Sequence, residues 1–279
     1  MSAIPFVKMH GLGNDFVVID ARRSPFPLDE AKAHAIADRK TGIGCDQLIV
    51  MEPPHRAEAD IFMRIHNADG GEVEACGNAT RCIAALVMAE RGGDRLVIET
   101  NAGLLEARPA PRGRVSVDMG KALLDWCDIP LARSQDTLHV DIALGPLADP
   151  VCSNIGNPHA TFFVDDVMSV ELEKLGPQLE RHPLFPARAN ISVGQVVAPN
   201  RIRLRVWERG VGITRACGTG ACAALVAAAR RRLTGRKGEI VLDGGTLNIE
   251  WRENGHVVMT GPVATSFHGS FDLADLVKH

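Results

Sequence analysis

The feature that most constrains the fold of this chain is an internal repeat. The segment ACGNATRCIAALV begins at residue 75, and the similar segment ACGTGACAALV begins at residue 216, which is 141 positions later. Polar residues elsewhere align in the same order at spacings of 141 to 143 positions: Asn14 with Asn157, Gln47 with Asn190, and Asn67 with Glu208. A collinear set of matches is hard to obtain by chance, so the sequence predicts a tandem duplication.

The repeat predicts two similar domains. We expect an N-terminal half over residues 1–125, a C-terminal half over residues 126–265, and a tail over residues 266–279 that packs back on the N-terminal half. A chain of 279 residues is long enough for two domains of ordinary size, each with its own core.

Each half has many strand-like segments and one long alanine-rich helix. We expect helices over residues 29–40, 78–91 and 219–233, because glycine follows each of them. The strand-like segments are FVVID, QLIVM, RLVIET, RVSVDM, TFFVDD, EIVLDG and HVVMTG. A helix that is apolar on most faces suits the centre of a curled sheet. The predicted fold class is therefore α/β (α+β), with two pseudo-symmetric domains, each a curled mixed sheet or barrel around a central alanine-rich helix.

The composition excludes several classes of protein. The formal net charge of −3 offers no basic field, so we expect no nucleic acid and no anionic membrane as a partner. The longest apolar run, residues 221–229, is much shorter than the ~20 residues that a membrane span needs. The N-terminal residues lack the apolar stretch of a signal peptide, so we expect a cytoplasmic protein with reduced thiols.

A cysteine followed by glycine stands just before each alanine-rich helix. These are Cys76-Gly77 and Cys217-Gly218. A helix N-terminus carries about half a positive charge and unpaired N–H groups, so it can stabilise a thiolate and bind a carboxylate. Glycine lets a ligand approach those N–H groups closely. A single cysteine at a helix start is commonly a buried, inert residue, but two in equivalent positions favour a functional role.

Two such thiols suit the inversion of a stereocentre beside a carboxylate. This reaction needs a base on one face of the carbon and an acid on the other, and a thiol whose pKa the helix lowers can fill either role. The glycine-rich stretches lack a nucleotide fingerprint, so we expect no cofactor. The spacings C-x₅-C and C-x₄-C have no nearby histidine pairs, so we expect no metal.

Polar residues that recur in both halves are candidates for a ligand pocket. Taken singly, an asparagine is more often a turn or cap residue, but recurrence favours binding. Arg209 can bind a carboxylate with both guanidinium nitrogens, and Glu208 can accept a hydrogen bond from an ammonium group. His159 could tune a thiol or could be an ordinary loop histidine. The remaining candidates are Asn14, Gln47, Asn67, Asn157 and Asn190.

At these residues the sequence resembles the diaminopimelate epimerases, which are cofactor-independent amino-acid epimerases of lysine and peptidoglycan biosynthesis. The resembling segments are KMHGLGNDF at 8–16, TGIGCDQ at 41–47, HNADGGEVEACGN at 66–78, GNPH at 156–159 and WERGVGITRACGTGAC at 207–222. The sequence departs from the family pattern at Ala79, Cys45 and Trp207.

The resemblance implies two pseudo-symmetric domains with the site in the cleft between them, and usually a homodimer. It implies that Cys76 is the proton donor and Cys217 the proton acceptor, while His159 and Glu208 adjust the thiol pKa values. It also implies substrate contacts from Asn14, Gln47, Asn67, Gly77, Asn78, Asn157, Asn190, Glu208, Arg209, Gly218 and Thr219.

The expected activity is the interconversion of LL-2,6-diaminopimelate and meso-2,6-diaminopimelate by proton transfer between two thiols. One alternative is an enzyme similar to proline or hydroxyproline racemases, although proline would leave Asn67, Asn190 and Arg209 without a distal group to bind. A second alternative is a thiol-redox protein in which Cys76 and Cys217 form a disulfide switch.

Overall fold

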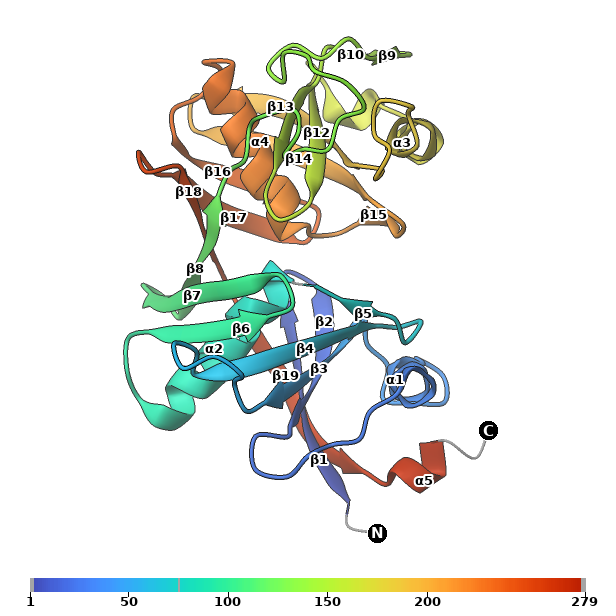
Figure 1. Cartoon of the computed structure of the whole chain (residues 1–279), viewed down its shortest axis with the longest axis vertical. Helices are drawn as coiled ribbons and strands as arrows, with labels where there is room; N and C mark the ends of the chain where they lie inside the picture. Colours follow the sequence, from blue (N-terminus) through green and yellow to red (C-terminus); the bar gives the residue numbers. More distant parts are fainter. Residues whose placement is uncertain (1–2, 75, 277–279) are drawn as a thin grey trace. The chain divides into compact units, whose positions relative to one another are not determined.

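The computed structural model describes residues 3–74 and 76–276 (Figure 1). Ala75, which opens the repeat in the first half, and residues 277–279 of the expected tail lie outside the described residues. The chain divides into two compact units, residues 1–117 with 261–279 and residues 118–260. These limits differ by a few residues from the expected halves, 1–125 and 126–265, which stay a prediction.

The first unit combines a mixed sheet with helices on either face. Its elements are β1 (Ile4–Gly11), β2 (Asn14–Asp20), α1 (Glu30–Ala37), β3 (Gln47–Glu52), β4 (Ile61–Asn67), β5 (Glu72–Val73), α2 (Gly77–Arg91), β6 (Leu96–Thr100), β7 (Gly103–Ala110), β19 (Ala264–Phe271) and α5 (Leu273–Leu276). Strand β8 (Arg114–Lys121) carries the chain out of this unit.

The second unit repeats this plan. Its elements are β9 (Ala143–Leu144), β10 (Leu147–Ala148), β11 (Val151–Asn154), β12 (Pro158–Phe163), η1 (Val167–Ser169), α3 (Leu172–Glu180), β13 (Asn190–Ala198), β14 (Arg201–Glu208), β15 (Gly212–Thr214), α4 (Gly218–Arg230), β16 (Lys237–Leu242), β17 (Gly245–Trp251) and β18 (His256–Gly261).

Strand pairing in the two units follows one scheme. In the first unit β19, β1, β2, β3, β4, β6 and β7 lie in that order, with β2–β3 and β4–β6 parallel. In the second unit the order is β11, β12, β13, β14, β16, β17 and β18, with β12–β13 and β14–β16 parallel. The parallel pairs thus fall in the same places when β19, an extra strand beside β1, is set aside and β1 is matched to β11.

The register of the strands also repeats. Phe16 pairs with Gln47 in the first unit, and His159 pairs with Asn190 in the second, 143 positions later on both strands. The short strands β5 and β15 lie in the same way beside β4 and β14. Polar residues that align in the sequence thus occupy equivalent places in two similar sheets.

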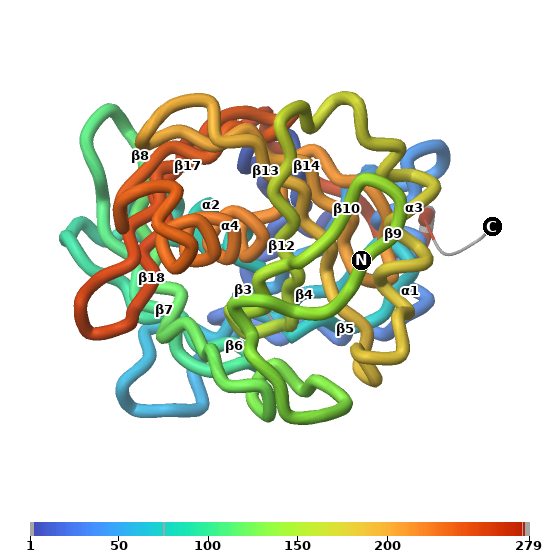
Figure 2. The backbone as a smooth tube through the Cα atoms, turned by 90° about the horizontal axis from the view of Figure 1, so that it is seen from above, coloured from blue at the N-terminus to red at the C-terminus, as the bar shows by residue number. Residues whose placement is uncertain are grey.

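An alanine-rich helix lies at the centre of each unit. Helix α4 packs on β11, β12, β13, β14, β16 and β17, and Figure 2 shows β17 on one side of it and β12 and β13 on the other. Ten of its thirteen residues are buried, because strands surround it and alanine lets them come close. Helix α2 packs on β1, β6 and β7. The expected fold class, a mixed α/β fold with curled sheets around alanine-rich helices, is confirmed.

The opposite face of each sheet carries a second helix, α1 on β3 and β4 and α3 on β13 and β14. Helix α3 is not anticipated by the sequence pattern, because Gly176 and Pro177 lie within it. Gly176 is required by packing, since a Cβ there would lie 2.5 Å from the ring of Trp207. In the described part of the chain, no helix is long and apolar enough to cross a membrane.

Candidate active site

A tight hairpin positions the first candidate residue, Asn14. The β1–β2 hairpin turns through Leu12 and Gly13, which have φ values of 58° and 85°. Two successive positive φ values characterise a type I′ turn, whose twist matches that of paired strands. Asn14 follows the turn as the first residue of β2 and pairs with Gly11 on β1. The glycine at position 13 is therefore required by backbone conformation.

Cys76 lies at the N-cap of α2, half-buried, and its side chain does not cap the helix. Its Sγ donates to Oδ1 of Asn14 at 3.8 Å, and Nδ2 of Asn78 donates to the same oxygen at 3.2 Å. The expected neighbours Asn14, Cys76 and Asn78 are therefore in contact. Gly77 is buried as the first residue of the helix.

Gln47 and Asn67 lie on adjacent strands in the same unit. They are directly opposite each other in the β3–β4 pairing, and Nε2 of Gln47 donates to Oδ1 of Asn67 at 2.9 Å. Gln47 Oε1 is buried without a hydrogen-bond partner among the residues that the structure describes. A buried acceptor of this kind is suited to a donor from a ligand.

Cys217 occupies the equivalent N-cap of α4, but its surroundings differ. The thiol is 3% exposed, and its Sγ accepts a hydrogen bond from the N–H of Gly220 at 3.4 Å. Oγ1 of Thr219 lies 3.6 Å from the same sulfur. The Glu208 carboxyl is also hydrogen-bonded to Cys217, and it accepts a hydrogen bond from Thr214. Cys217 thus shares its site with a carboxyl group.

The structure corrects the expectation that the helix lowers the thiol pKa at Cys217. Burial raises its pKa well above the usual value and the Glu208 charge raises it further, against the lowering effects of Thr219 and Gly220. Burial likewise raises the pKa of Glu208, although the Thr214 hydroxyl lowers it. At the buried Cys217 thiol, loss of water outweighs the helix N-terminus, so Cys217 rests as a thiol.

Asn157, His159, Asn190 and Arg209 form a connected group in the second unit. The ring Nε2 of His159 lies 2.7 Å from Oδ1 of Asn157. Asn190 donates through Nδ2 to the carbonyl of Pro158 at 3.0 Å and accepts the N–H of Arg209 at 2.9 Å. Burial lowers the pKa of His159 to about 3, and the Arg209 charge adds to this effect. His159 is therefore neutral near pH 7.

Helix α3 is hydrogen-bonded to the turn that contains Glu208 and Arg209. The carboxyl of Glu180, 3% exposed, accepts the indole N–H of Trp207 at 2.7 Å and the N–H of Gly210 at 3.1 Å. The sequence gives no signal for Glu180, because it lies 27 residues before Trp207 in a segment that does not read as a helix. The Arg209 side chain extends to the carbonyl of Ala187 at 2.9 Å and stays exposed.

The candidate residues thus fall into two groups, one in each unit. The first group contains Asn14, Gln47, Asn67, Cys76, Gly77 and Asn78. The second group contains Asn157, His159, Asn190, Glu208, Arg209, Cys217, Gly218 and Thr219. Each group has a thiol at a helix start and amide side chains from the neighbouring strands.

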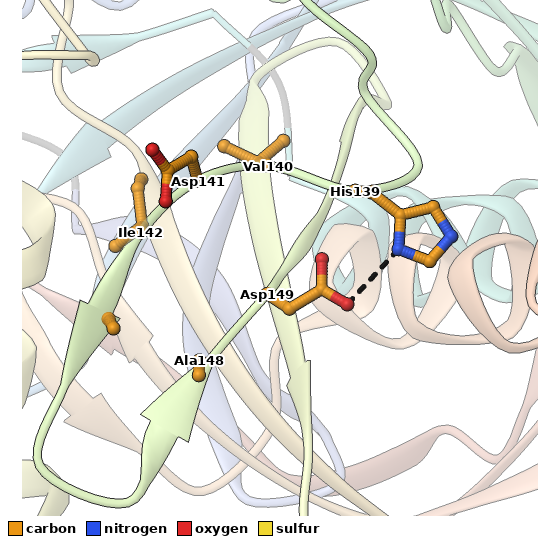
Figure 3. Close-up of a pocket in the computed structure, with 7 residues that line it drawn as sticks. His139, Val140, Asp141, Ile142, Ala148 and Asp149 are labelled. Carbon is orange, nitrogen blue, oxygen red and sulfur yellow. Dashed lines mark hydrogen bonds and ion pairs between the residues drawn. The ribbon is translucent and has the colours of Figure 1, made fainter.

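A separate hollow of about 460 Å³ lies in the second unit, beside the β9–β10 hairpin. Its lining includes His139 and Asp149, whose side chains are in hydrogen-bond contact at 3.1 Å (Figure 3), and none of its residues belongs to either group. Among residues 3–74 and 76–276, no cluster of three or more His, Cys, Asp or Glu side chains could hold a metal ion.

Comparison with solved structures defines the class of fold. A hydroxyproline epimerase from Agrobacterium vitis aligns with a TM-score of 0.68 at 16% identity, over 97% of this chain and 91% of that one. A phenazine biosynthesis protein of the PhzF family from Bacillus anthracis aligns with a TM-score of 0.69 at 18% identity, over 98% and 100%. The fold is therefore the one that these two proteins share.

Sequence comparison identifies the family. The diaminopimelate epimerase model matches residues 6–124 and 151–266. The diaminopimelate epimerase of Rhodospirillum centenum is 62% identical over 95% of this chain and 91% of its own length. That of Acidiphilium cryptum is 58% identical over 99% of both chains. The chain belongs to the diaminopimelate epimerase family.

Proposed function

We propose that this chain interconverts LL-2,6-diaminopimelate and meso-2,6-diaminopimelate, in the synthesis of lysine and of peptidoglycan precursors, without a cofactor. One observation carries the mechanism. Cys76 and Cys217 stand at equivalent helix starts in two units with the same strand register. Family membership supports the choice of substrate, and the paired thiols support two-base proton transfer.

The helix starts supply the binding groups for the reacting end of the substrate. N–H groups at Gly77-Asn78 and Gly218-Thr219 would hold its carboxylate, since a helix N-terminus favours negative charge. The same groups would stabilise the charge that passes into the carboxylate when the α-proton leaves. The exposed guanidinium of Arg209 and the amides of Asn67 and Asn190 would bind the distal amino-acid end.

The proton path starts at Cys217. For LL substrate, Glu208 accepts the Cys217 proton, and the resulting thiolate removes the α-proton. The Cys76 thiol then donates its own proton to the opposite face, which gives the meso isomer and leaves Cys76 as thiolate. The proton taken from carbon stays on Cys217. Glu208 then releases to solvent the proton that it accepted, and Cys76 regains a proton from solvent, which restores the starting state.

Thr214→Val tests the part of this path that runs through Glu208. Valine removes the hydroxyl that donates to the carboxylate, so the pKa of Glu208 should rise further. The acidic limb of the pH profile of kcat/KM should move to higher pH, because a base must be ionised to act. A hydrogen bond to a charged group contributes about 1.5–3 kcal/mol, so activity at the acidic end should fall by about 10- to 150-fold.

Thr214→Ser, which keeps the hydroxyl, is the matched control and should preserve the wild-type profile. A uniform loss of activity at every pH in Thr214→Val would contradict the role assigned to Glu208.

We also propose a homodimer in the cytoplasm. Sedimentation of the purified protein should give about twice the 30.0 kDa chain mass. A species of monomer mass at assay concentrations would exclude the dimer.

The assay that tests the substrate uses reduced protein, dialysed against chelator, with no added cofactor. LL-diaminopimelate should give meso-diaminopimelate, and the reverse conversion should reach the same ratio. Proline and 4-hydroxyproline, run in parallel, should not be converted, because they lack the distal group. Conversion of proline but not of diaminopimelate would favour the racemase alternative. Activity that required an oxidised protein would favour the redox alternative.

A further inference from the structure

A chain of hydrogen bonds runs from the Asp46 carboxylate to the Arg81 guanidinium, and Cys76 contacts its middle. At one end, Nδ2 of Asn14 donates a hydrogen bond to Oδ2 of Asp46 at 3.1 Å. In the middle, Oδ1 of Asn14 accepts Nδ2 of Asn78 at 3.2 Å and faces the sulfur of Cys76. At the other end, Oδ1 of Asn78 accepts Nη2 of Arg81 at 2.8 Å. The chain links residues of β2 and α2 with Asp46, the residue just before β3.

The two ions fix the direction of both amides. A carboxylate can only accept a hydrogen bond, so Asn14 must turn its Nδ2 toward Asp46 and its Oδ1 toward Cys76. A guanidinium can only donate, so Asn78 must turn its Oδ1 toward Arg81 and its Nδ2 toward Asn14. Neither amide can flip without placing two donors or two acceptors against each other.

Further charges hold Asp46 in place. Arg39 donates to Asp46 at 2.7 Å and to Asp15 at 2.5 Å, while Asp15 also pairs with Lys8 at 2.5 Å. The backbone N–H of each of the two aspartates donates to the carboxylate of the other, at 3.1 Å in both cases. Burial opposes ionisation of Asp15, but Arg39 and Lys8 lower its pKa to about 2. Asp15 is therefore ionised at neutral pH.

The second unit has no such chain of charges at the equivalent positions. Counting from the repeated register, Asp15 corresponds to Pro158, Asp46 to Ala189 and Arg81 to Cys222. There, Oδ1 of Asn157 instead meets the neutral ring of His159. Of the two candidate catalytic thiols, only Cys76 faces an asparagine oxygen whose direction such a chain of charges fixes, whereas Cys217 has the Glu208 carboxyl beside it.

We infer that Asp46 is a positioning residue which, through Asn14, keeps a hydrogen-bond acceptor directed at Cys76 and so holds that thiol protonated. A group that accepts from S–H favours the thiol over the thiolate. This inference rests on the proposed function. In the conversion of LL substrate to meso product, Cys76 is the general acid, and a protonated thiol has the proton that it must donate. Asp46 acts on the reaction only through Asn14.

The test measures the ionisation of Cys76 without substrate. Cys76 in Asp46→Asn should be alkylated by iodoacetamide about tenfold faster near pH 7 than in the wild type, because Asn14 is then free to turn its donor toward the sulfur. Peptide mass spectrometry separates Cys76 from the other cysteines. Cys217 should keep its wild-type rate. The kcat for LL substrate should fall while KM changes little.

Asp15→Asn is the matched control, since it removes the same charge beside Asn14 but leaves the contact between Asn14 and Asp46. Its Cys76 alkylation should change far less, and Asp46→Glu should restore a slow rate. If Cys76 were alkylated equally faster in Asp46→Asn and Asp15→Asn, loss of charge alone would explain the effect and the inference would be overturned. An unchanged alkylation rate in Asp46→Asn would overturn it as well. Thermal unfolding checks that each variant is folded. A wild-type enzyme inactive on diaminopimelate would defeat the proposed function, whatever the alkylation rates are.

Discussion

Replacing Cys76 or Cys217 by alanine should lower the rate of epimerisation by at least about 10²–10⁴-fold, the usual contribution of a general acid or base. Both single variants should be affected to this extent, because inversion needs a group on each face of the carbon. The measurement is kcat/KM for LL-diaminopimelate and for the meso isomer under reducing conditions.

Cys82→Ala is the control, because this cysteine lies inside α2 and burial raises its pKa to about 12. Its activity should stay close to wild type, with only a modest loss of stability. Near-normal turnover in either Cys76→Ala or Cys217→Ala would refute the acid–base assignment.

Arg209→Lys should lower kcat/KM for LL-diaminopimelate by about 5- to 150-fold. Lysine keeps the positive charge but loses the planar fork that binds a carboxylate with two nitrogens, a change of roughly 1–3 kcal/mol. The side chain is exposed and contacts the backbone carbonyl of Ala187, so the protein should fold normally.

Arg181→Lys is the control for this change, because Arg181 is also exposed and lies at the end of α3. It should leave kcat/KM unchanged. A normal kcat/KM in Arg209→Lys would remove Arg209 from the set of substrate ligands.

The sequence predicts most of the frame that carries the two thiols. Cysteine and glycine before an alanine-rich run place Cys76 and Cys217 at helix starts, and both are N-cap residues in the structure. The aligned residues Gln47 and Asn190 begin equivalent strands. These features are local, or repeat at a fixed spacing, so a single sequence reveals them.

The environment of each thiol could not be predicted in the same way. The pKa of Cys217 depends on burial and on Glu208, which only the packed fold determines. The contact of Asp46 with Asn14 spans 32 residues and has no counterpart in the second repeat, so the duplication gives no signal for it. Arg81, fully buried in α2, reads in the sequence as an exposed charge among alanines.

Epimerisation in D₂O tests the two-thiol mechanism most directly. If Cys217 removes the proton and Cys76 supplies another, the donor has already exchanged with solvent. The first meso product formed from LL substrate should then carry deuterium at the inverted carbon, while the remaining LL substrate stays essentially unlabelled early in the reaction. Product that retains much of the original hydrogen would contradict the account, because a single base would then serve both faces.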